Sequence, residues 1–359
     1  MNDIKDIRAK INEIDDKIRE LFEERMAAAK DVAEYKRLHG LPILDKERER
    51  QVIENNVAKI KNDELRPYYV NFLQDTMAVS RSYQDTLLLG MKVGYSGVAG
   101  AFAYIAATKL FPTGRKISYP NFEAAYRACL EGECDSVVLP IENSYNGEVG
   151  AVTDLMFSGP LMVNGVIDID ITHCLLGAPG ATISDIKRVV SHPQALAQCR
   201  GYIRSHGFSE DEFENTAMAA EHVKELGDKS VGAIASEEAA KLFGLTILEK
   251  NVNESRSNTT RFAVFSRSEH KHDPSEGGIH SILLFTVRNE AGALAKTLDI
   301  IGAHNFNMRN LRSRPMKELL WNYYFFVEAE GNVATESGQD MLRELSAVCA
   351  RLKLGGTYR

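Results

Sequence analysis

The 359-residue chain is longer than one ordinary hydrophobic core requires, which predicts two or three domains. Its formal net charge of −7 argues against nucleic acid as the main partner, and no apolar run is long enough to cross a membrane. The charged first residues lack the apolar region of a signal peptide, and the five cysteines form no CxxC pair, so we expect a cytoplasmic protein with reduced thiols. The histidines show no HxxxH or HExxH spacing, so no metal site is expected.

The first third of the chain has a helical pattern. Apolar residues recur every three or four positions from residue 4 to residue 33, which is typical of one long helix with a coiled-coil-like seam. Gly40 and Pro42 should end this helix, a second should begin near Asp45, and a third should run from about Glu64 to Gly90. The pattern therefore predicts an all-helical domain over residues 1–89.

From residue 91 to residue 267, short β-rich runs alternate with alanine-rich helical segments. This alternation predicts an α/β domain with largely parallel sheets. Each run leads into a loop of small or polar residues, and ligands of open α/β sheets bind beyond the carboxyl ends of strands. We therefore expect the functional residues of this domain on those loops.

The last part of the chain follows a polar stretch, residues 266–278, which is typical of a linker. Residues 279–359 then show the order strand, helix, two strands, helix, strand. This βαββαβ order predicts an α+β ferredoxin-like domain.

Cationic residues on the first helix suggest a site for a small dianion. Arg25 and Lys36 lie eleven residues apart, about 16 Å along one helix face, so their long side chains can converge. Arg8 lies about 26 Å from Arg25 along the same helix and would have to serve a pocket on a second chain. From spacing alone, a solvated charged face is the commoner explanation.

A resemblance to the all-helical chorismate mutase family favours the functional interpretation. It covers residues 3 to about 88 and rests on residues 7–11, 24–25, 36, 45–49, 80 and 84. The resemblance implies that Arg25, Arg48 and, from the partner chain, Arg8 bind the two carboxylates of chorismate. A degenerate mutase that serves only as a dimerisation arm is the alternative for this domain.

The same resemblance assigns the remaining polar residues of the mutase site. Lys36 and Gln84 would be catalytic and bond to the ether oxygen, Glu49 would bind the ring hydroxyl, and Asp45 and Ser80 belong to the same set. The rearrangement of chorismate is unimolecular, so a protein need only fold the substrate and stabilise charge on the breaking ether bond. Cations and amides provide both effects.

A glycine-rich segment in the α/β domain raises the possibility of a dinucleotide site. Gly94, Gly97 and Gly100 have the spacing GxxGxxG rather than the GxGxxG of dinucleotide-binding proteins. A mutase fused to a nicotinamide-dependent prephenate dehydrogenase remains an alternative, as does a solute-binding protein or sensor with two α/β lobes. The glycines instead suit the approach of backbone amides to a substrate carboxylate.

Four segments of the α/β domain resemble hallmark segments of prephenate dehydratases, in the same order. They are residues 139–144, 172–175, 191–198 and 258–262. The first contains Asn143 and Ser144, which the resemblance places among the substrate-binding residues. It implies a two-lobed domain of periplasmic-binding-protein-like fold over residues 91–267 that needs no cofactor.

The dehydratase resemblance also assigns roles to single residues. Prephenate loses carbon dioxide and hydroxide, and hydroxide needs a proton donor to leave. The resemblance assigns this donor role to Thr260 and implies that Arg261 pairs with a substrate carboxylate. Glu142, Ser191 and Gln198 would line the pocket, although Ser191 could also be a helix N-cap and Glu142 a solvated loop carboxylate.

The C-terminal domain resembles the ACT domain of prephenate dehydratases. Residues 292–295 should open a helix after a strand, and residues 311–315 should lie on the next strand. The resemblance implies a phenylalanine site between two subunits, formed by Gly292, Ala293, Leu294, Leu311 and Ser313. Arg312 departs from the family pattern, which has glutamate there, and a purely structural dimerisation domain is the alternative.

Together these resemblances predict a bifunctional, multidomain enzyme of phenylalanine biosynthesis. It would convert chorismate to prephenate, and prephenate to phenylpyruvate, under feedback inhibition by phenylalanine. A homodimer or a homotetramer is expected. The choice between prephenate and its aminated analogue arogenate stays open.

Overall fold

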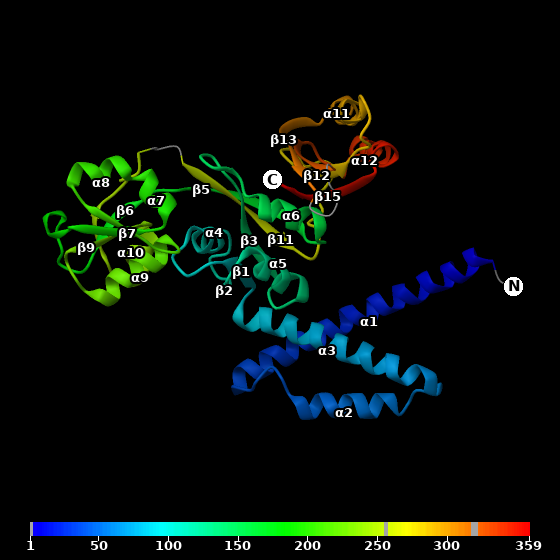
Figure 1. The fold of residues 1–359 in the computed structure, drawn as a ribbon. Helices are drawn as coiled ribbons and strands as arrows, with labels where there is room; N and C mark the ends of the chain where they lie inside the picture. Colours follow the sequence, from blue (N-terminus) through cyan, green and yellow to red (C-terminus); the bar gives the residue numbers. More distant parts are fainter. Residues whose placement is uncertain (1–2, 255–257, 317–321) are drawn as a thin grey trace. The chain divides into compact units, whose positions relative to one another are not determined.

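The computed structural model describes residues 3–254, 258–316 and 322–359 of the chain. It separates into two compact units, one formed by residues 1–91 with 113–115 and the other by residues 92–112 with 116–359 (Figure 1). We call the first the helical unit and the second the α/β unit. Within the described residues, no helix has both the length and the apolar character needed to span a membrane.

The helical unit is all-helical, as predicted. It contains α1 (Ile4–His39), α2 (Lys46–Val57), the short 3-10 helix η1 (Asp63–Leu65) and α3 (Arg66–Leu89). Gly40 ends α1 in a left-handed conformation with φ of 63°, which favours a residue without a side chain. Asp45 caps α2, where its carboxylate accepts a hydrogen bond from the backbone N–H of Arg48.

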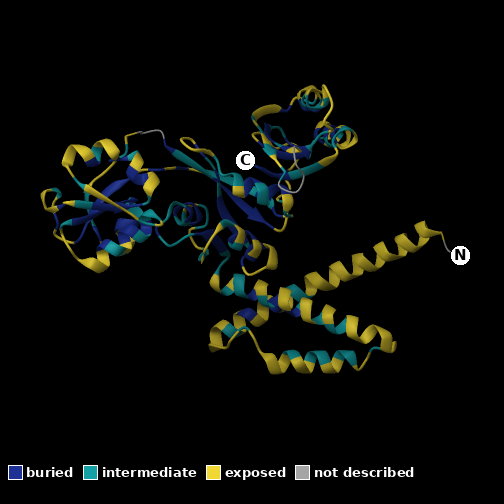
Figure 2. Ribbon diagram, in the orientation of Figure 1, coloured by how far each residue is buried: buried dark blue, intermediate teal, exposed yellow. Residues whose placement is uncertain are grey.

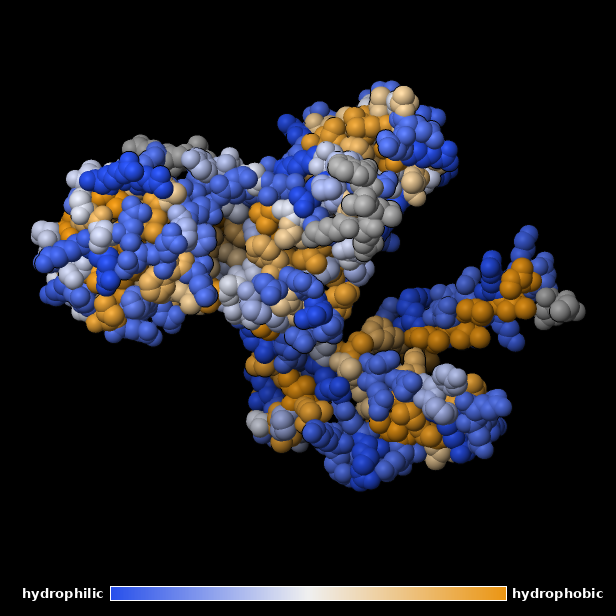
Figure 3. All heavy atoms as spheres, viewed as in Figure 1, coloured by the Kyte–Doolittle hydropathy of each residue, from blue (hydrophilic) through white to orange (hydrophobic). Residues whose placement is uncertain are grey.

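The apolar seam of α1 is exposed within this chain. Only Ala29 and Ala33 of α1 are buried, both in its C-terminal half. The isoleucines of the N-terminal half are between 45% and 57% exposed, namely Ile4, Ile7, Ile11, Ile14 and Ile18. Figure 2 shows this half of the helix as exposed, and Figure 3 shows the apolar stripe along it. Monomeric soluble proteins rarely expose a continuous apolar surface of this kind.

The dehydratase-like part of the α/β unit has two lobes, each built on one sheet. The first lobe contains β1 (Lys92–Ser96), α4 (Phe102–Leu110), β2 (Arg115–Tyr119), α5 (Phe122–Glu131), β3 (Ser136–Asn143), β4 (Gly147–Glu148), α6 (Gly150–Ser158), β5 (Met162–Asp170) and β11 (Thr259–Ser266). The second contains β6 (Cys174–Gly177), η2 (Ile183–Asp185), β7 (Arg188–Ser191), α7 (Pro193–Gln198), α8 (Arg200–His206), β8 (Ser209–Glu212), α9 (Thr216–Leu226), β9 (Val231–Ala235), α10 (Glu237–Phe243) and β10 (Thr246–Glu249).

The sheets of both lobes are mixed, so the prediction of largely parallel sheets was wrong. β1 is parallel to β3, and β7 is parallel to β8 and β9. β11 is antiparallel to both β3 and β5, and β6 is antiparallel to both β9 and β10. The reason is that β5 carries the chain out of the first lobe and β11 brings it back alongside. The pattern of strands and helices does not reveal this return.

Strand β11 places the functional segments of the first lobe next to one another. It lies between β3 and β5, so Thr260 is in register with Asn143 on one side and with Ile169 on the other. The backbone pairing continues past the end of β5, where the N–H of Ile171 donates to Asn258 at 2.7 Å. Segments that are more than a hundred residues apart in sequence therefore meet where the chain passes between the lobes.

The C-terminal part has the predicted ferredoxin-like order. It contains β12 (His280–Thr286), α11 (Ala293–Ala303), β13 (Asn307–Pro315), β14 (Tyr323–Glu330), α12 (Glu336–Val348) and β15 (Arg351–Tyr358). The four strands are antiparallel to their neighbours in the order β13-β14-β12-β15, and the parallel pairing of β15 with β5 joins them to the sheet of the first lobe. We call these four strands the C-terminal sheet. Leu283 and Val327 face the core shared with α11 and α12, whereas Leu284 and Phe326 face the core of the first lobe.

Candidate active sites

The helical unit brings four of the predicted mutase residues together between α1 and α3. The Nη1 of Arg25 donates to the hydroxyl of Ser80, and the Nζ of Lys36 donates to the Oε1 of Gln84 at 3.5 Å. Ser80 and Gln84 are buried, and they lie one turn apart on α3. The site thus has two cations from one helix and two uncharged hydrogen-bonding side chains from another.

The predicted residues of α2 lie differently. Glu49 forms an ion pair with Arg81 of α3, Asp45 serves as the N-cap, and Arg48 is exposed. The sequence reasoning missed Arg81, although it follows Ser80 directly in the sequence. Arg8 is exposed and has no side-chain contact among the described residues. The helical unit of one chain therefore assembles part of the predicted set and leaves Arg8 and Arg48 open to solvent.

The α/β unit contains a chain of buried and half-buried polar side chains that links the two lobes. The Nδ2 of Asn143 lies 2.8 Å from the hydroxyl of Thr260 and 2.8 Å from the Oδ1 of Asn258. The Nδ2 of Asn258 donates to the Oε1 of Gln198 at 3.1 Å, and the Nε2 of His173 lies 3.0 Å from the same oxygen. Of these five residues the sequence prediction had included Asn143, Gln198 and Thr260.

Asn258 and His173 were not among the predicted site residues. Both lie in segments that resemble those of prephenate dehydratases, and this position in the sequence was the signal that could have identified them. His173 is only 2% exposed, and burial lowers the pKa of its imidazole, an effect that the hydrogen bond with Gln198 partly offsets. The neutral ring then donates from Nε2, because the Oε1 of Gln198 can only accept. His173 therefore orients Gln198.

The orientation of the Asn143 amide determines the hydrogen bonding of Thr260. The Oδ1 of Asn143 accepts from the backbone N–H groups of Tyr145 and Asn146, at 3.0 and 2.9 Å. The Nδ2 therefore faces Thr260, whose oxygen accepts a hydrogen bond and keeps its own proton available to donate. A cavity of about 300 Å³, lined in part by Tyr145, Gln198 and Asn258, adjoins this chain of side chains.

Three other predicted dehydratase residues, Glu142, Ser144 and Arg261, lie on the opposite face of this sheet. Because side chains alternate along a strand, Arg261 points away from Thr260. Its Nε donates to Asp168 at 3.0 Å, and its Nη1 lies 3.3 Å from Glu328 of the C-terminal sheet. Burial lowers the pKa of Arg261, but the hydrogen bond with Asp168 and the charge of Glu328 outweigh it, so the guanidinium stays charged.

Glu142 and Ser144 share that second face with Arg261. Glu142 forms an ion pair with Arg312 of β13, and the Ser144 hydroxyl accepts from the backbone of Thr259 at 2.9 Å. These residues and Arg261 line a separate cavity of about 490 Å³. The predicted dehydratase residues of the first lobe are thus divided between two faces of one sheet.

Ser191 is fully buried at the end of β7, away from both faces. Its hydroxyl donates to the carbonyl oxygen of Ile234 on β9 at 2.5 Å. The N-cap of α7 is His192, so Ser191 is not the helix cap considered from the sequence. In this structure Ser191 ties two strands of the second lobe together.

The predicted effector residues lie on the helix side of the C-terminal sheet. Gly292 precedes α11 with φ of 81°, followed by Ala293 and Leu294 in the first turn. On β13, Leu311 and Ser313 are exposed. Arg312 points the opposite way, toward the first lobe, because alternate residues of a strand face opposite sides. The residue that departs from the family pattern is therefore not directed at the predicted effector site.

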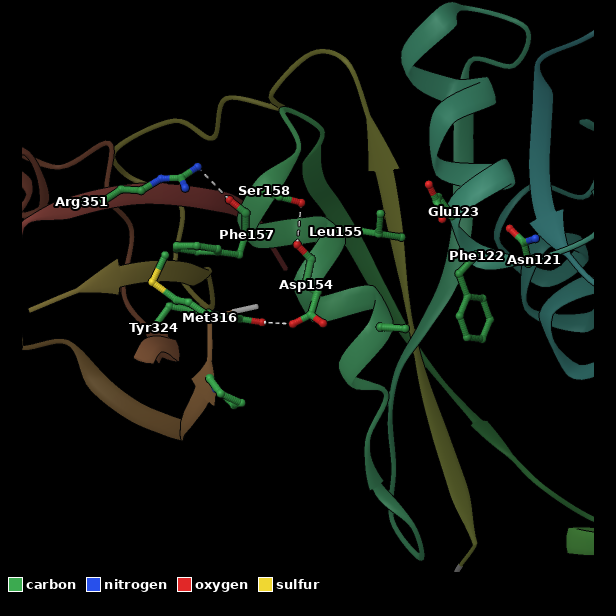
Figure 4. A pocket seen from close by; sticks show the side chains of 12 residues that line it. Asn121, Phe122, Glu123, Asp154, Leu155, Phe157, Ser158, Met316, Tyr324 and Arg351 are labelled. Atoms are coloured by element: carbon green, nitrogen blue, oxygen red, sulfur yellow. Dashed lines mark hydrogen bonds between the residues drawn. The ribbon is translucent and has the colours of Figure 1, made fainter. Parts of the chain in front are cut away.

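A further cavity, of about 580 Å³, contains none of the predicted residues. It lies between α6 and the C-terminal sheet, where Phe157 stacks on Tyr324 with ring centroids 4.2 Å apart (Figure 4). The guanidinium of Arg351 lies over the ring of Phe157 and donates to the backbone carbonyl oxygen of Phe157 at 3.1 Å. The hydroxyl of Tyr324 donates to the carboxylate of Asp154 at 2.7 Å. These charged groups hold the two parts together, so the cavity is a poor candidate for catalysis.

Comparisons with known proteins match both parts of the chain. Residues 7–85 match the family model of chorismate mutase type II, and residues 93–270 match that of prephenate dehydratase. The bifunctional chorismate mutase/prephenate dehydratase of Aquifex aeolicus (strain VF5) is 34% identical over 376 residues, covering 100% of this chain and 98% of that protein.

Two solved structures each match about three quarters of the chain. The prephenate dehydratase of Arthrobacter aurescens in complex with L-Phe is 27% identical with a TM-score of 0.68, covering 74% of this chain and 89% of that one. A structure described as GqqA, a novel type of quorum quenching acylase, is 33% identical with a TM-score of 0.69, covering 74% and 97%.

The side-chain cluster between α1 and α3, the polar chain between the lobes and the near-complete coverage of a bifunctional relative agree with one another. The chain belongs to the family of bifunctional chorismate mutase/prephenate dehydratases.

Proposed function

We propose that this bifunctional enzyme of phenylalanine biosynthesis rearranges chorismate at the α1–α3 pocket and dehydrates prephenate at the Asn143–Thr260 pair. The observation that carries the dehydratase assignment is the Asn143 amide, which is held by two backbone N–H groups and donates to Thr260. The mutase assignment rests on Arg25 and Lys36, which converge on the buried Ser80 and Gln84.

In the mutase site the protein supplies shape and charge rather than a reacting group. Arg25 would hold a carboxylate of chorismate in the folded conformation that the rearrangement needs. Lys36 and Gln84 would donate to the ether oxygen as its bond to carbon breaks and negative charge develops on it. The Nζ of Lys36 also donates to the carbonyl oxygen of Ile43 at 2.5 Å, which holds the ammonium group beside the side chain of Gln84.

In the dehydratase site the carboxylate of prephenate leaves as carbon dioxide, and its bonding electron pair moves into the ring. The ring electrons expel the hydroxyl group, which takes the Thr260 proton and leaves as water. The Thr260 oxygen is then negatively charged until solvent returns a proton. The N–H of Asn143 already donates to this oxygen and stabilises that charge, which makes a weak acid a better proton donor.

The exposed seam of α1 supports pairing of two copies of this chain. Isoleucines along the N-terminal half of α1 bury little surface within one chain. Packing against a second copy would bury them and would place Arg8 of one copy near the pocket of the other. The proposal is a homodimer or a larger homo-oligomer in which each mutase site draws on two chains.

The C-terminal ferredoxin-like part is proposed to be an ACT domain that binds phenylalanine. The start of α11 and the exposed Leu311 and Ser313 lie on one side of the C-terminal sheet. The complex of the Arthrobacter aurescens relative with L-Phe supports the choice of ligand. Binding between two copies would shift the population of dimer arrangements and lower dehydratase activity.

Replacing Lys36 by alanine should lower the mutase kcat on the order of a hundredfold, because the ether oxygen loses its cationic donor. Conversion of chorismate is the measurement, with dehydratase turnover of prephenate unchanged in the same sample. Lys30→Ala is the matched control, since Lys30 is an exposed lysine of the same helix. Near-normal mutase turnover in Lys36→Ala would contradict the assignment.

Co-expression of Arg8→Ala chains with Lys36→Ala chains should restore mutase activity to about a quarter of wild type. Half of the dimers are then mixed, and each mixed dimer has one intact site of two. The control mixes Arg25→Ala with Lys36→Ala, which leaves a damaged residue in every pocket and should restore nothing. Equal activity in the two mixtures argues against a shared site.

Thr260→Val should abolish formation of phenylpyruvate from prephenate, because valine keeps the shape of threonine and removes its proton. Thr260→Ser, which retains the hydroxyl, should keep measurable activity. Mutase activity serves as the control in both variants. A valine variant that still dehydrates prephenate at the wild-type rate rules out Thr260 as the donor.

Phenylalanine should inhibit dehydratase activity at millimolar concentrations, and Ser313→Trp should weaken the inhibition by filling the exposed effector face. Tyrosine is the control ligand. Isothermal titration calorimetry gives the binding constant independently of turnover. No heat of binding and no inhibition by phenylalanine would remove the proposed regulation.

A further inference from the structure

Two carboxylates face each other in the hairpin formed by β3 and β4. The antiparallel register pairs Glu142 directly with Glu148, and the next pair is Asn143 with Gly147. Like charges in directly opposed positions of an antiparallel pair repel each other and destabilise the pairing. A strand of only two residues, Gly147–Glu148, has few backbone hydrogen bonds with which to resist that repulsion.

Two arginines of β13 compensate these two charges. Arg312 forms an ion pair with Glu142, and the Nη1 of Arg314 lies 3.4 Å from the Oε2 of Glu148. The arginines are two residues apart on one strand, so their side chains leave the same face of the C-terminal sheet. Arg314 also donates to Asp154 of α6 at 3.0 Å, which fixes its position.

The pairs are partly buried, so solvent screens them weakly. The side chains of Arg312 and Glu142 are 18% and 32% exposed, and those of Arg314 and Glu148 are 23% and 16% exposed. Gly150 makes room for this arrangement, since a Cβ there would lie 2.2 Å from the Nη1 of Arg314. Removing one partner of such a pair leaves a charge that water can only partly solvate.

The hairpin also holds the proton-donor site. Asn143 is the neighbour of Glu142, and its Oδ1 accepts from Tyr145 and Asn146 in the turn between β3 and β4. The Nδ2 of the same amide donates to Thr260. Any opening of the hairpin therefore rotates or frees the amide that orients Thr260.

We propose that Arg312 and Arg314 hold the β3–β4 hairpin closed by neutralising Glu142 and Glu148, so that the C-terminal sheet positions Asn143 against Thr260. Arg312 and Arg314 are then positioning residues for the dehydratase reaction. The catalytic consequence rests on the proposed function of Thr260, whereas the closure of the hairpin does not.

The test compares Arg312→Gln with the double variant Arg312→Gln/Glu148→Gln in the full-length chain. Hydrogen exchange of the backbone amides of Tyr145 and Asn146 should become on the order of tenfold faster in the single variant. The dehydratase kcat should fall on the order of tenfold to a hundredfold, with a smaller change in KM. Both effects should largely disappear in the double variant, because the opposed charge is gone.

Two further variants keep the outcome decisive. Arg309→Gln removes an arginine of the same strand whose ion pair, with Glu330, stays within the C-terminal sheet, and should leave exchange at the hairpin unchanged. Arg312→Lys keeps the charge without the planar fork and should give an intermediate rate of exchange. It also reports on closure if the glutamine variant does not fold.

The proposal is overturned if hydrogen exchange at Tyr145 and Asn146 keeps its wild-type rate in both Arg312 variants. It is also overturned if exchange becomes faster in Arg312→Gln and the added Glu148→Gln substitution does not slow it again. A third outcome is faster exchange in Arg312→Gln that Glu148→Gln reverses, while the dehydratase rate stays at the wild-type value in every variant. This outcome supports closure of the hairpin by the arginines and contradicts the role given to Asn143 and Thr260. The two failures are therefore distinguishable.

Discussion

The pairing of β11 with β3 and β5 is the constraint on which the dehydratase half of this molecule depends. It places Thr260 beside Asn143 and puts Asn258 within reach of Gln198 in the other lobe. Because β11 returns to the first lobe after the second lobe is complete, its residues pair with strands that precede the second lobe in the sequence. Alternation along this strand then assigns Thr260 to one face of the sheet and Arg261 to the other.

The two active sites solve different chemical problems in similar ways. In the helical unit, cations converge on buried uncharged partners, Ser80 and Gln84, so the charges are positioned without being neutralised by an acid. In the α/β unit, an amide held by backbone N–H groups donates to the hydroxyl that we propose as the proton donor. In both proposed sites the position of the groups supplies most of the effect.

The C-terminal sheet has two faces with two separate tasks. Its helix side carries the proposed effector residues, while the opposite side packs on the first lobe through Leu284 and Phe326 and through the Arg312–Glu142 pair. A single layer of strands therefore connects the proposed effector site on one side with the proposed catalytic site beyond the other. Arg312, which departs from the family pattern, belongs to this connection rather than to the effector site.

The sequence by itself determined the helical N-terminal part and the βαββαβ order of the C-terminal part, because periodicity and helix caps are local. The candidate residue sets came from short motifs that resemble those of known families. Only the tertiary structure decided that the sheets are mixed, that Ser191 ties β7 to β9, and that Glu142 and Arg261 lie on a different face from Asn143 and Thr260. Strand direction, register and ion pairs between distant segments depend on which strands become neighbours. Which strands become neighbours depends on how the whole core is buried, and this cannot be read from a local sequence pattern.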